Sequence, residues 1–523
     1  MKPPALYLAW PKPPSATELV DAVRRHPKRP LHLIVCLPEP VLPDWTAAGN
    51  DPLYRALADC LRCVQFTGSN YCSHILPDVH LWLLPEAASR RLYQHFPQPP
   101  QWQDTPVPQE MPVSLKPWFA AAPSATPQRV LLIGAGIAGA ATAYELAQHG
   151  VEVCVLEAGR AAGAASGNRQ GLLYAKISPH PTEQTELLLC GYGYTRRLLE
   201  RLLPENDAWG GHGVLHLNHN EAESRRNAAL SQHAHHRHLY RGVSAAEAAA
   251  IAGIPVGQDA LYWPQGVWLN PATLIRALLA HPLIRLHENT ALQNIHRQHG
   301  LWHADTPQGR FSGSHIVFCC GADSIHTPLI RDFPFRQIRG QTSVVCASTG
   351  SRALRAALSG SSYISPSWQD NHCFGASFIP DDGSAELRQS DEAANRHALA
   401  ELSPYLHQSF AESFTDAAHG HAAVRCDSRD HLPVVGALGE AAQMRRLYAK
   451  LAADKNYRLN TPCPWWENAY ANTAHGSRGL ATAPLCAAEI AAQICGTPAP
   501  LSARLRQALH PNRLIIRDII HRN

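Results

Sequence analysis

The chain has 523 residues, a hydrophobic content of 45% and a formal net charge of +4 with its 30 histidines counted as neutral. This length exceeds what a single hydrophobic core usually serves, so two or more domains are expected. No stretch is apolar for long enough to cross a membrane, and the proline-broken start MKPPALYLAWPKPP lacks the apolar core of a signal peptide. These features predict a cytoplasmic protein that does not contact membranes, and the small net charge permits an anionic partner without requiring one.

Residues 1–95 form the first predicted unit, a small α/β piece. Strand-like runs stand at residues 31–38 (LHLIVCLP) and 79–85 (VHLWLLP), and a helical pattern lies between them around residues 51–64. Residues 96–127 are rich in Pro, Gln, Ser and Ala, and this composition is typical of an extended linker.

Cysteines within the first unit raise the alternative of a zinc site. Cys60 and Cys63 are three residues apart, and Cys72 and His74 follow. Residues three apart also share one face of a helix, and no second pair stands at zinc-finger spacing. We therefore favour apolar helix packing and predict no metal site. The 14 cysteines are expected to be reduced, because several lie inside apolar runs.

A phosphate-binding pattern begins after the linker. An apolar strand at residues 130–133 runs into Gly134-x-Gly136-x-x-Gly139 and then into a helical pattern. The first glycine permits a tight turn, the second lets the backbone approach a pyrophosphate, and the third allows close packing of helix and strand. A second strand, VEVCVLE, ends at Glu157, where a carboxylate can accept hydrogen bonds from ribose hydroxyls. Glu157 disfavours a 2′-phosphate, so NAD and FAD remain.

A second small-residue loop, GAASGNRQGLLYAK at residues 163–176, favours FAD over NAD. It contains Ser166, Asn168, Arg169 and Gly171. One pyrophosphate needs only one such cradle, whereas an extended FAD can use a second loop along its ribityl chain. The alternative is a flexible surface loop.

The remaining pattern predicts an α/β fold (α+β overall) in which a Rossmann-type FAD-binding domain is interrupted by a mainly antiparallel β substrate domain. Residues 128–205, 270–330 and 424–500 are assigned to the FAD-binding part. Residues 206–269 and 331–423 are assigned to the substrate domain.

Five motifs carry a resemblance that spans residues 128–515. The chain resembles flavin-dependent amine oxidoreductases of the glycine/D-amino-acid oxidase type, and among these the FAD domain of the MnmC family, which modifies the wobble uridine of tRNA. The motifs are ASGNRQG at 165–171, RGQ at 339–341, RDHLPVVG at 429–436, HGSRGLATAPL at 475–485 and LHPNR at 509–513.

The resemblance implies non-covalent FAD and a set of residues that line it. The loop at residues 476–480 and a helix at 481–493 would face the flavin ring, where helix dipoles stabilise the anionic reduced flavin. The complete predicted cofactor set is Gly134, Gly136, Gly139, Glu157, Ser166, Asn168, Arg169, Gly171, Leu292, Gly476, Ser477, Arg478, Gly479 and Leu480.

The substrate implied by the family carries a secondary amine one methylene away from a carboxylate. Such a substrate needs a neutral amine and a fixed cation for the carboxylate, but hydride loss itself requires no general base. Arg425 stands where oxidases of this type place that cation, and its guanidinium fork matches a carboxylate. The alternative is an ion pair with Asp427 or Asp430. The further candidates for the catalytic site are Arg339, Tyr363 and His475.

The predicted reaction is the FAD-dependent removal of the carboxymethyl group from 5-carboxymethylaminomethyl-(2-thio)uridine in tRNA, which leaves the aminomethyl form. The aromatic run at 262–271, with Trp263 and Trp268, is a candidate to face the base, and basic stretches at 196–201 and 455–460 are candidates to contact tRNA. Two alternatives stay open: an oxidase of free glycine-like or sarcosine-like amino acids, and a non-catalytic FAD-containing scaffold that binds tRNA.

The first unit faintly resembles an internal portion of the methyltransferase domain that precedes the FAD domain in the same family. It lacks a strand followed by a glycine-rich loop and an acid-ended second strand. We therefore interpret residues 1–95 as a methyltransferase-like remnant that binds no methyl donor, and expect the methyl-transfer step to be absent.

Overall fold

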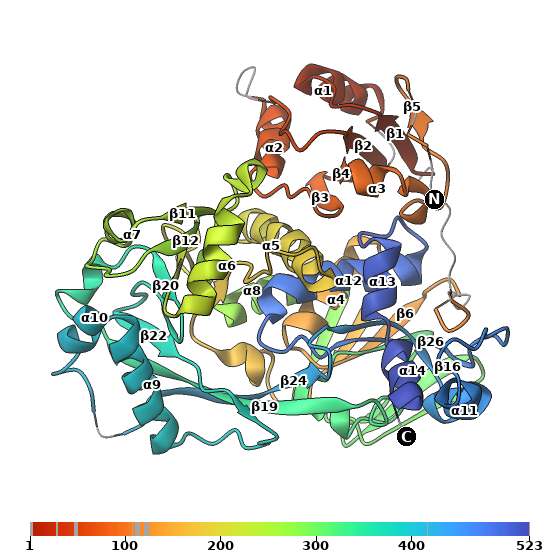
Figure 1. The fold of residues 1–523 in the computed structure, drawn as a ribbon. Helices are drawn as coiled ribbons and strands as arrows, with labels where there is room; N and C mark the ends of the chain where they lie inside the picture. Colours follow the sequence, from red (N-terminus) through yellow and green to blue (C-terminus); the bar gives the residue numbers. More distant parts are fainter. Residues whose placement is uncertain are drawn as a thin grey trace.

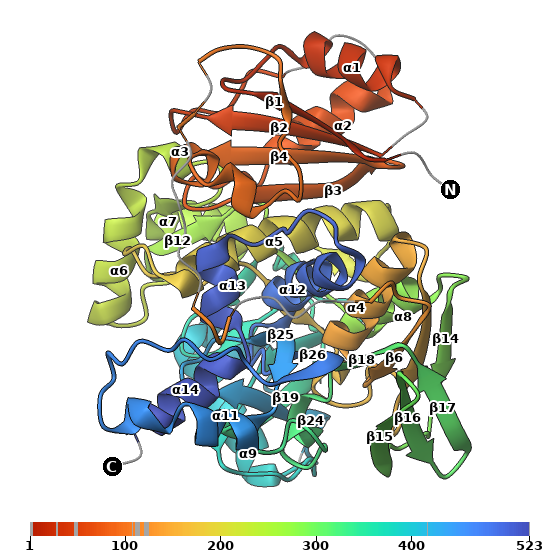
Figure 2. The same cartoon turned by 90° about the vertical axis from the view of Figure 1, so that its right-hand side faces the viewer.

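The computed structural model describes residues 4–27, 30–45, 51–106, 108–109, 116–119, 125–415 and 417–521. They form a small N-terminal unit, red and orange in Figure 1, that is stacked on a larger body (Figures 1 and 2). No helix among the described residues combines the length and the apolar character that a membrane crossing needs.

The N-terminal unit is a five-stranded sheet in the order β3-β4-β2-β1-β5. All neighbouring strands are parallel except β3, which runs antiparallel to β4. The strands are β1 (Leu6–Trp10), β2 (Leu31–Leu37), β3 (Asn70–Leu76), β4 (Val79–Pro85) and β5 (Gln101–Trp102), and the helices are α1 (Ala16–Arg25), α2 (Pro52–Leu61) and α3 (Glu86–Ser89). Because β5 pairs with β1, this sheet takes in residues that the sequence analysis assigned to the linker.

The cysteines of this unit pack in its interior. Cys60 on α2 and Cys63 just beyond the helix are both buried within apolar clusters. Across the described ranges, no group of three or more His, Cys, Asp and Glu side chains is placed to hold a metal ion.

A six-stranded sheet forms the centre of the larger body, in the order β14-β7-β6-β18-β26-β25, and only β25 is antiparallel to its neighbour. The strands are β6 (Arg129–Ile133), β7 (Glu152–Leu156), β14 (Ile284–His287), β18 (His315–Phe318), β25 (Val434–Gly439) and β26 (Trp465–Thr473). Alternate residues of β6 and β7 face opposite sides, so the sheet is buried on both faces.

Helices cover one face of this sheet and separate it from the N-terminal unit (Figure 2). They are α4 (Ile137–Gln148), α5 (Glu183–Leu202), α8 (Pro271–Leu279), α12 (Gly479–Cys495) and α13 (Ala503–Leu509). The other face packs against a three-stranded sheet and two helices, namely β15 (Asn294–Gln298), β16 (Leu301–Thr306), β17 (Gly309–Gly313), α11 (Ala441–Leu447) and α14 (Asn512–His521).

A second large sheet of nine strands is mainly antiparallel, in the order β11-β12-β10-β20-β21-β22-β19-β23, and β24 also pairs with β19. Its strands are β10 (Val214–Leu217), β11 (Arg241–Val243), β12 (Ala260–Trp263), β19 (Phe335–Cys346), β20 (Ala357–Ser359), β21 (Tyr363–Ile364), β22 (Asn371–Gly375), β23 (Ile379–Pro380) and β24 (Gly420–Ser428). The accompanying helices are α6 (Glu221–Ser231), α7 (Ala245–Ala252), α9 (Gln389–Leu402) and α10 (Pro404–Ser409). A small sheet of β8 (Gly171–Leu173), β9 (Trp209–Gly210) and β13 (Val267–Leu269) completes the body.

The predicted fold class is confirmed: a Rossmann-type parallel sheet is interrupted in sequence by a mainly antiparallel one. The predicted domain boundary at residue 424 falls inside β24, which is a continuous strand of the antiparallel sheet.

The N-terminal sheet docks on α5 through arginines that had been candidates to contact tRNA. The Arg197 guanidinium donates to the Tyr71 carbonyl at 3.0 Å, and that of Arg201 donates to the Ser73 carbonyl at 2.8 Å. These two side chains of the basic stretch at 196–201 therefore point into the junction between the units and serve packing.

Candidate active site

A cavity of about 430 Å³ opens between the six-stranded and nine-stranded sheets. Its walls come from the first glycine loop, the second small-residue loop, strands β19, β21 and β24, and the loop that leads into α12. No Asp or Glu stands among the described residues that line it, whereas Arg425 does.

The first glycine loop turns sharply from β6 into α4 at one end of this cavity. Gly134 has φ +102°, and a Cβ there would come within 2.5 Å of the Cys319 carbonyl oxygen. A Cβ on Gly139 would overlap the Gly134 carbonyl oxygen, so only glycine allows helix and strand to approach this closely. Gly136 lines the cavity as the N-cap of α4 and makes no side-chain capping bond. Ser166 Oγ of the second small-residue loop accepts from the Ile137 amide, the first of α4, at 3.1 Å. The following amides of the first turn have no partner within the helix and can bond to a ligand.

Glu157 stands beside this loop at the end of β7. Its Oε2 accepts from the Ala135 amide at 2.7 Å, and its Oε1 accepts from the Gly159 amide at 2.9 Å. Each carboxylate oxygen keeps further acceptor capacity. The backbone thus fixes the carboxylate at the place where the fingerprint predicts a ribose.

The second small-residue loop contributes Ser166, Asn168 and Gly171 to the cavity wall. The Asn168 amide donates to the Tyr363 hydroxyl at 3.0 Å, and its Oδ1 accepts from Thr342 Oγ1 at 3.1 Å. This bonding ties the loop to the antiparallel sheet, so the loop has a defined position rather than a flexible one.

Six of the fourteen predicted cofactor residues are not among those that line the cavity, namely Gly134, Gly139, Glu157, Arg169, Leu292 and Arg478. Arg169 and Leu292 are the two of these that contact other parts of the chain instead. The Arg169 guanidinium lies 4.8 Å over the Trp368 ring and donates to the Trp368 carbonyl at 2.8 Å, so stacking draws it away. Leu292 packs against the apolar cluster on the far side of the six-stranded sheet. Neither side chain therefore borders the cavity.

The loop into α12 closes another part of the cavity. Gly476, Ser477, Gly479 and Leu480 all line it, and Gly476 has φ +55°. The helix begins at Gly479, two residues earlier than predicted, and its N-cap residue Arg478 makes no side-chain capping bond. The Arg478 side chain does not line the cavity, and burial lowers its pKa. The N-terminus of α12, whose N-cap residue supplies no side-chain cap, therefore also faces the cavity.

Strand β19 separates the cavity from a buried polar network, because successive side chains of a strand point to opposite faces. Gly340 lies opposite Ala423 of β24, and Thr342 lies opposite His421. All four residues line the cavity. Sequence reasoning had not assigned Thr342 to the site, although the alternation in the motif RGQT could have indicated it.

Arg425 projects into the cavity from β24. Its Nη1 donates to the Ser377 carbonyl at 3.4 Å, and within the described part of the chain it forms no ion pair. Asp427 instead contacts His431, and Asp430 contacts Arg513, so the alternative of an Arg425–carboxylate pair is excluded. Burial lowers the pKa of Arg425, yet a guanidinium remains charged at neutral pH. A Cβ on Gly340 would overlap this guanidinium, so the bare backbone there makes room for it.

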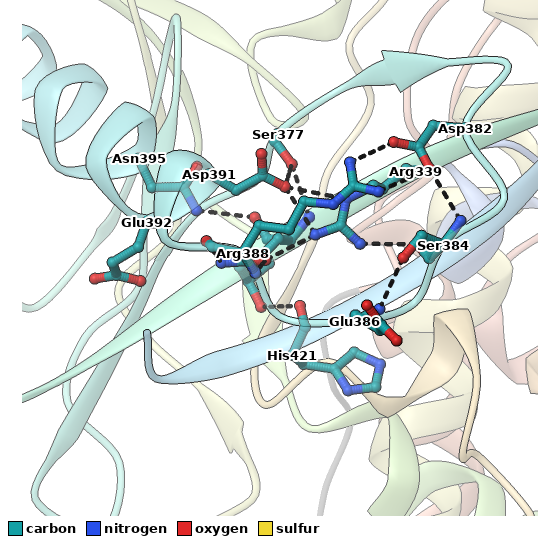
Figure 3. A network of polar contacts seen from close by, with 12 residues as sticks. Arg339, Ser377, Asp382, Ser384, Glu386, Arg388, Asp391, Glu392, Asn395 and His421 are labelled. Atoms are coloured by element: carbon teal, nitrogen blue, oxygen red, sulfur yellow. Dashed lines mark hydrogen bonds and ion pairs between the residues drawn. The ribbon is translucent and has the colours of Figure 1, made fainter. Parts of the chain in front are cut away.

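Arg339 is absent from the cavity lining and belongs to a network of polar contacts beside β19 (Figure 3). Its side chain is 0% exposed and donates to Asp391 Oδ2 at 3.2 Å and to the Ser384 carbonyl at 2.7 Å. Arg339 therefore does not line the cavity, because the alternation that sends Gly340 into the cavity sends Arg339 away from it.

Tyr363 and His475 line the cavity and stay uncharged at neutral pH. The Tyr363 hydroxyl donates to the Gln170 carbonyl at 3.0 Å, and burial raises its pKa well above the ordinary value. His475 contacts Asn472 Oδ1 at 3.0 Å and Thr482 Oγ1 at 2.9 Å, and burial lowers its pKa to about 3. The Tyr363 hydroxyl therefore keeps its proton, and burial makes the neutral His475 imidazole a weak proton acceptor.

The predicted aromatic candidates serve packing. Trp263 is 1% exposed and Trp268 is 6% exposed. Trp268 lies against Trp368, with 5.9 Å between ring centroids. Neither tryptophan lines the cavity.

Comparison with known proteins gives one family and a consistent fold. Residues 129–493 match the model of the FAD dependent oxidoreductase family, DAO. The tRNA 5-methylaminomethyl-2-thiouridine biosynthesis bifunctional protein MnmC of Chromobacterium violaceum is 38% identical over 411 residues, which cover 78% of this chain and 62% of that protein. The protein of the same name from Pseudomonas entomophila is 37% identical over 411 residues, with coverages of 77% and 62%. The chain thus spans 62% of the length of these relatives.

Solved structures show the same fold at low sequence identity. Glycine oxidase from Geobacillus kaustophilus aligns with a TM-score of 0.58 and 19% identity over 72% of this chain and 98% of that one. L-proline dehydrogenase from P. horikoshii aligns with a TM-score of 0.58 and 14% identity over 74% and 98%.

Proposed function

This chain belongs to the FAD-dependent oxidoreductase family, and from that membership we propose that it removes the carboxymethyl group from 5-carboxymethylaminomethyl-(2-thio)uridine at the wobble position of tRNA. The product is the 5-aminomethyl form. Relatives that are 37–38% identical are named for biosynthesis of 5-methylaminomethyl-2-thiouridine in tRNA. That nucleoside contains the aminomethyl group that the proposed reaction leaves, which supports the choice of substrate.

The residues of the cavity fit FAD. Gly136 leaves a cradle that a larger side chain would fill, the N-cap residues of α4 and α12 make no side-chain capping bond, and Glu157 keeps acceptor capacity. We propose that the first glycine loop and Glu157 hold the pyrophosphate and a ribose. Ser166, Asn168 and Gly171 then border the middle of the cofactor, and the loop at residues 476–480 borders the flavin ring. When bound, the flavin supplies a hydride acceptor.

The observation that carries the proposal is the Arg425 guanidinium, which faces the cavity without an ion-pair partner among the described residues. A buried cation of this kind is costly unless a ligand neutralises it, and its planar fork binds a carboxylate with two hydrogen bonds. Arg425 would therefore hold the carboxylate of the substrate arm and orient the adjoining methylene.

The rest of the cavity lining suits oxidation of an amine. The absence of Asp and Glu from the described lining leaves no negative charge to stabilise an ammonium ion, so burial favours the neutral amine whose lone pair assists hydride loss. Tyr363 and His475 remain neutral and polar. The resulting imine reacts with water, which releases the aminomethyluridine and a two-carbon oxoacid.

The test is anaerobic reduction of the bound flavin by tRNA that carries the carboxymethylaminomethyl nucleoside. The wild-type flavin should lose its absorbance, and Arg425→Lys should keep FAD but react about 5- to 150-fold more slowly, because an ammonium group cannot reproduce the two-bond fork (about 1–3 kcal/mol). Arg429→Lys is the matched control, since that side chain is 61% exposed. Equal rates for wild type and Arg425→Lys would contradict the assignment.

Two other outcomes distinguish the alternatives. Reduction by sarcosine or glycine but not by tRNA would support a free amino-acid oxidase. Bound FAD without reduction by any of these would support a scaffold. In cells, a deletion strain should accumulate the carboxymethylaminomethyl nucleoside, which mass spectrometry of wobble nucleosides detects.

A further inference from the structure

An exposed aromatic side chain stands next to the mouth of the cavity. Phe378 is 57% exposed, although phenylalanine is usually buried. It follows Ala376, which lines the cavity, and Ser377, whose carbonyl accepts from Arg425. Packing within this chain does not explain such an exposure at this place.

The strand register indicates which way Phe378 faces. Arg339 of β19 lies opposite Ile379 of β23, and the Ser377 amide donates to the Gln341 carbonyl at 3.0 Å, which continues the pairing. Phe378 therefore lies opposite Gly340. Opposite residues of an antiparallel pair share a face, so its ring emerges on the face of β19 that borders the cavity.

Buried polar contacts fasten the segment at residues 376–388 that carries this ring (Figure 3). Ser377 Oγ donates to Asp391 Oδ2 at 3.1 Å and accepts from the Gln341 amide at 2.9 Å. The fully buried Arg339 donates to the Ser384 carbonyl at 2.7 Å. A ring on a fixed backbone loses little conformational freedom when a ligand binds, which favours binding.

We infer that Phe378 is the platform on which the uracil ring of the substrate stacks while its amine-bearing arm enters the cavity toward Arg425. This inference rests on the proposed function and names a residue that recognises the base. Aromatic faces stack with unpaired bases, and each such contact contributes appreciably to affinity. Trp263 and Trp268 are buried, and Trp368 is covered by Arg169, so these rings are not available for the same role.

The test measures flavin reduction and tRNA affinity for the FAD-loaded full chain. For Phe378→Ala, the apparent KM for tRNA carrying the carboxymethylaminomethyl nucleoside should rise at least about fivefold, with a smaller change in kcat. The Kd for the same tRNA, measured by fluorescence anisotropy, should rise in parallel. Phe378→Trp should stay within about twofold of wild type, because indole stacks at least as well as phenyl. Leu387→Ala is the matched control, since Leu387 is 47% exposed on the same segment.

Each contrary result overturns the inference in a distinguishable way. An unchanged KM for Phe378→Ala, while wild type is reduced by tRNA, removes the stacking role and leaves the proposed function intact. An equal loss in Phe378→Trp, or in Leu387→Ala, means that the segment and not the aromatic ring matters. If modified tRNA reduces no flavin in the wild-type protein, the proposed function fails, and the stacking role fails with it.

Discussion

Two strand–helix junctions of this molecule have the same topology and opposite chemistry. In the larger body, β6 leads into α4 through Gly134, Gly136 and Gly139. The N-cap residue Gly136 has no side chain to cap the helix, and only the first amide, that of Ile137, bonds to a side chain, Ser166 Oγ at 3.1 Å. In the N-terminal unit, β1 leads into α1 through the proline-rich segment PKPPS. There Ser15 and Glu18 form a capping box, in which each side chain bonds to the backbone amide of the other residue.

The difference shows what turns a parallel sheet into a nucleotide site. At α1 the chain satisfies its own helix amides and adds a carboxylate from Glu18, which repels an anion. At α4 the N-cap glycine adds neither a capping oxygen nor a charge, and it lets a ligand approach the backbone of the first turn. The fold supplies a helix N-terminus in both units, but only the local sequence decides whether a phosphate can use it.

Substitution of Gly136 should break the open junction and have the largest effect. Gly136→Val should abolish FAD binding, because the new side chain fills the cradle, while the ordinary φ of −76° at this position tolerates valine. Flavin absorbance per protein measures the effect. Gly257→Val is the control, since nothing lies within 4 Å of a Cβ there. Full flavin occupancy in Gly136→Val would refute the cradle.

Acidification should weaken both units, because each buries a neutral histidine. Burial lowers the pKa of His475 to about 3, and burial together with His149 and His74 lowers that of His32 to about 3. The unfolded chain then binds more protons below pH 6.5, so the stability present above this pH is lost as the pH falls toward 3. Between pH 6.5 and 5 each histidine contributes a loss of about 2 kcal/mol. A Tm that does not fall from pH 7.5 to pH 5 at constant ionic strength would contradict this.

Removal of the cap at α1 should affect stability alone. Ser15→Ala should lower the free energy of unfolding by about 1 kcal/mol and leave the flavin content unchanged. Ser15→Asp, which retains a capping oxygen, should recover most of the loss. Thermal unfolding followed by circular dichroism measures both variants. Loss of flavin in Ser15→Ala would mean that the two junctions are coupled rather than independent.

The smallest expected effect is the response of the N-terminal unit to a methyl donor. Because the β1–α1 junction is closed by its own cap, calorimetry with S-adenosylmethionine should show no saturable heat, and aminomethyl-uridine tRNA should receive no methyl group. Saturable binding with turnover would overturn the interpretation of residues 1–95 as a remnant.

The local sequence was sufficient to predict those parts of the site that are formed by residues close together in the chain. Gly134, Gly136, Gly139 and Glu157 were predictable because a turn, a helix start and a strand end are set within one short stretch of chain. The uncapped start of α12 was predictable to within two residues for the same reason. The pattern of short strands and helices also predicted that the antiparallel sheet interrupts the parallel sheet in the sequence.

Only the tertiary structure decided which side chains meet across distance. Arg339 and Arg425 are indistinguishable as arginines in strands, but the register of β19 with β24 sends one behind the wall and the other into the cavity. The Arg169 side chain was expected to bind the cofactor, but it stacks on Trp368, nearly two hundred positions later in the chain, and donates to its carbonyl. The local sequence does not determine which face of a strand borders the cavity. That depends on the side chains of the neighbouring strand and of the helix that packs on the sheet.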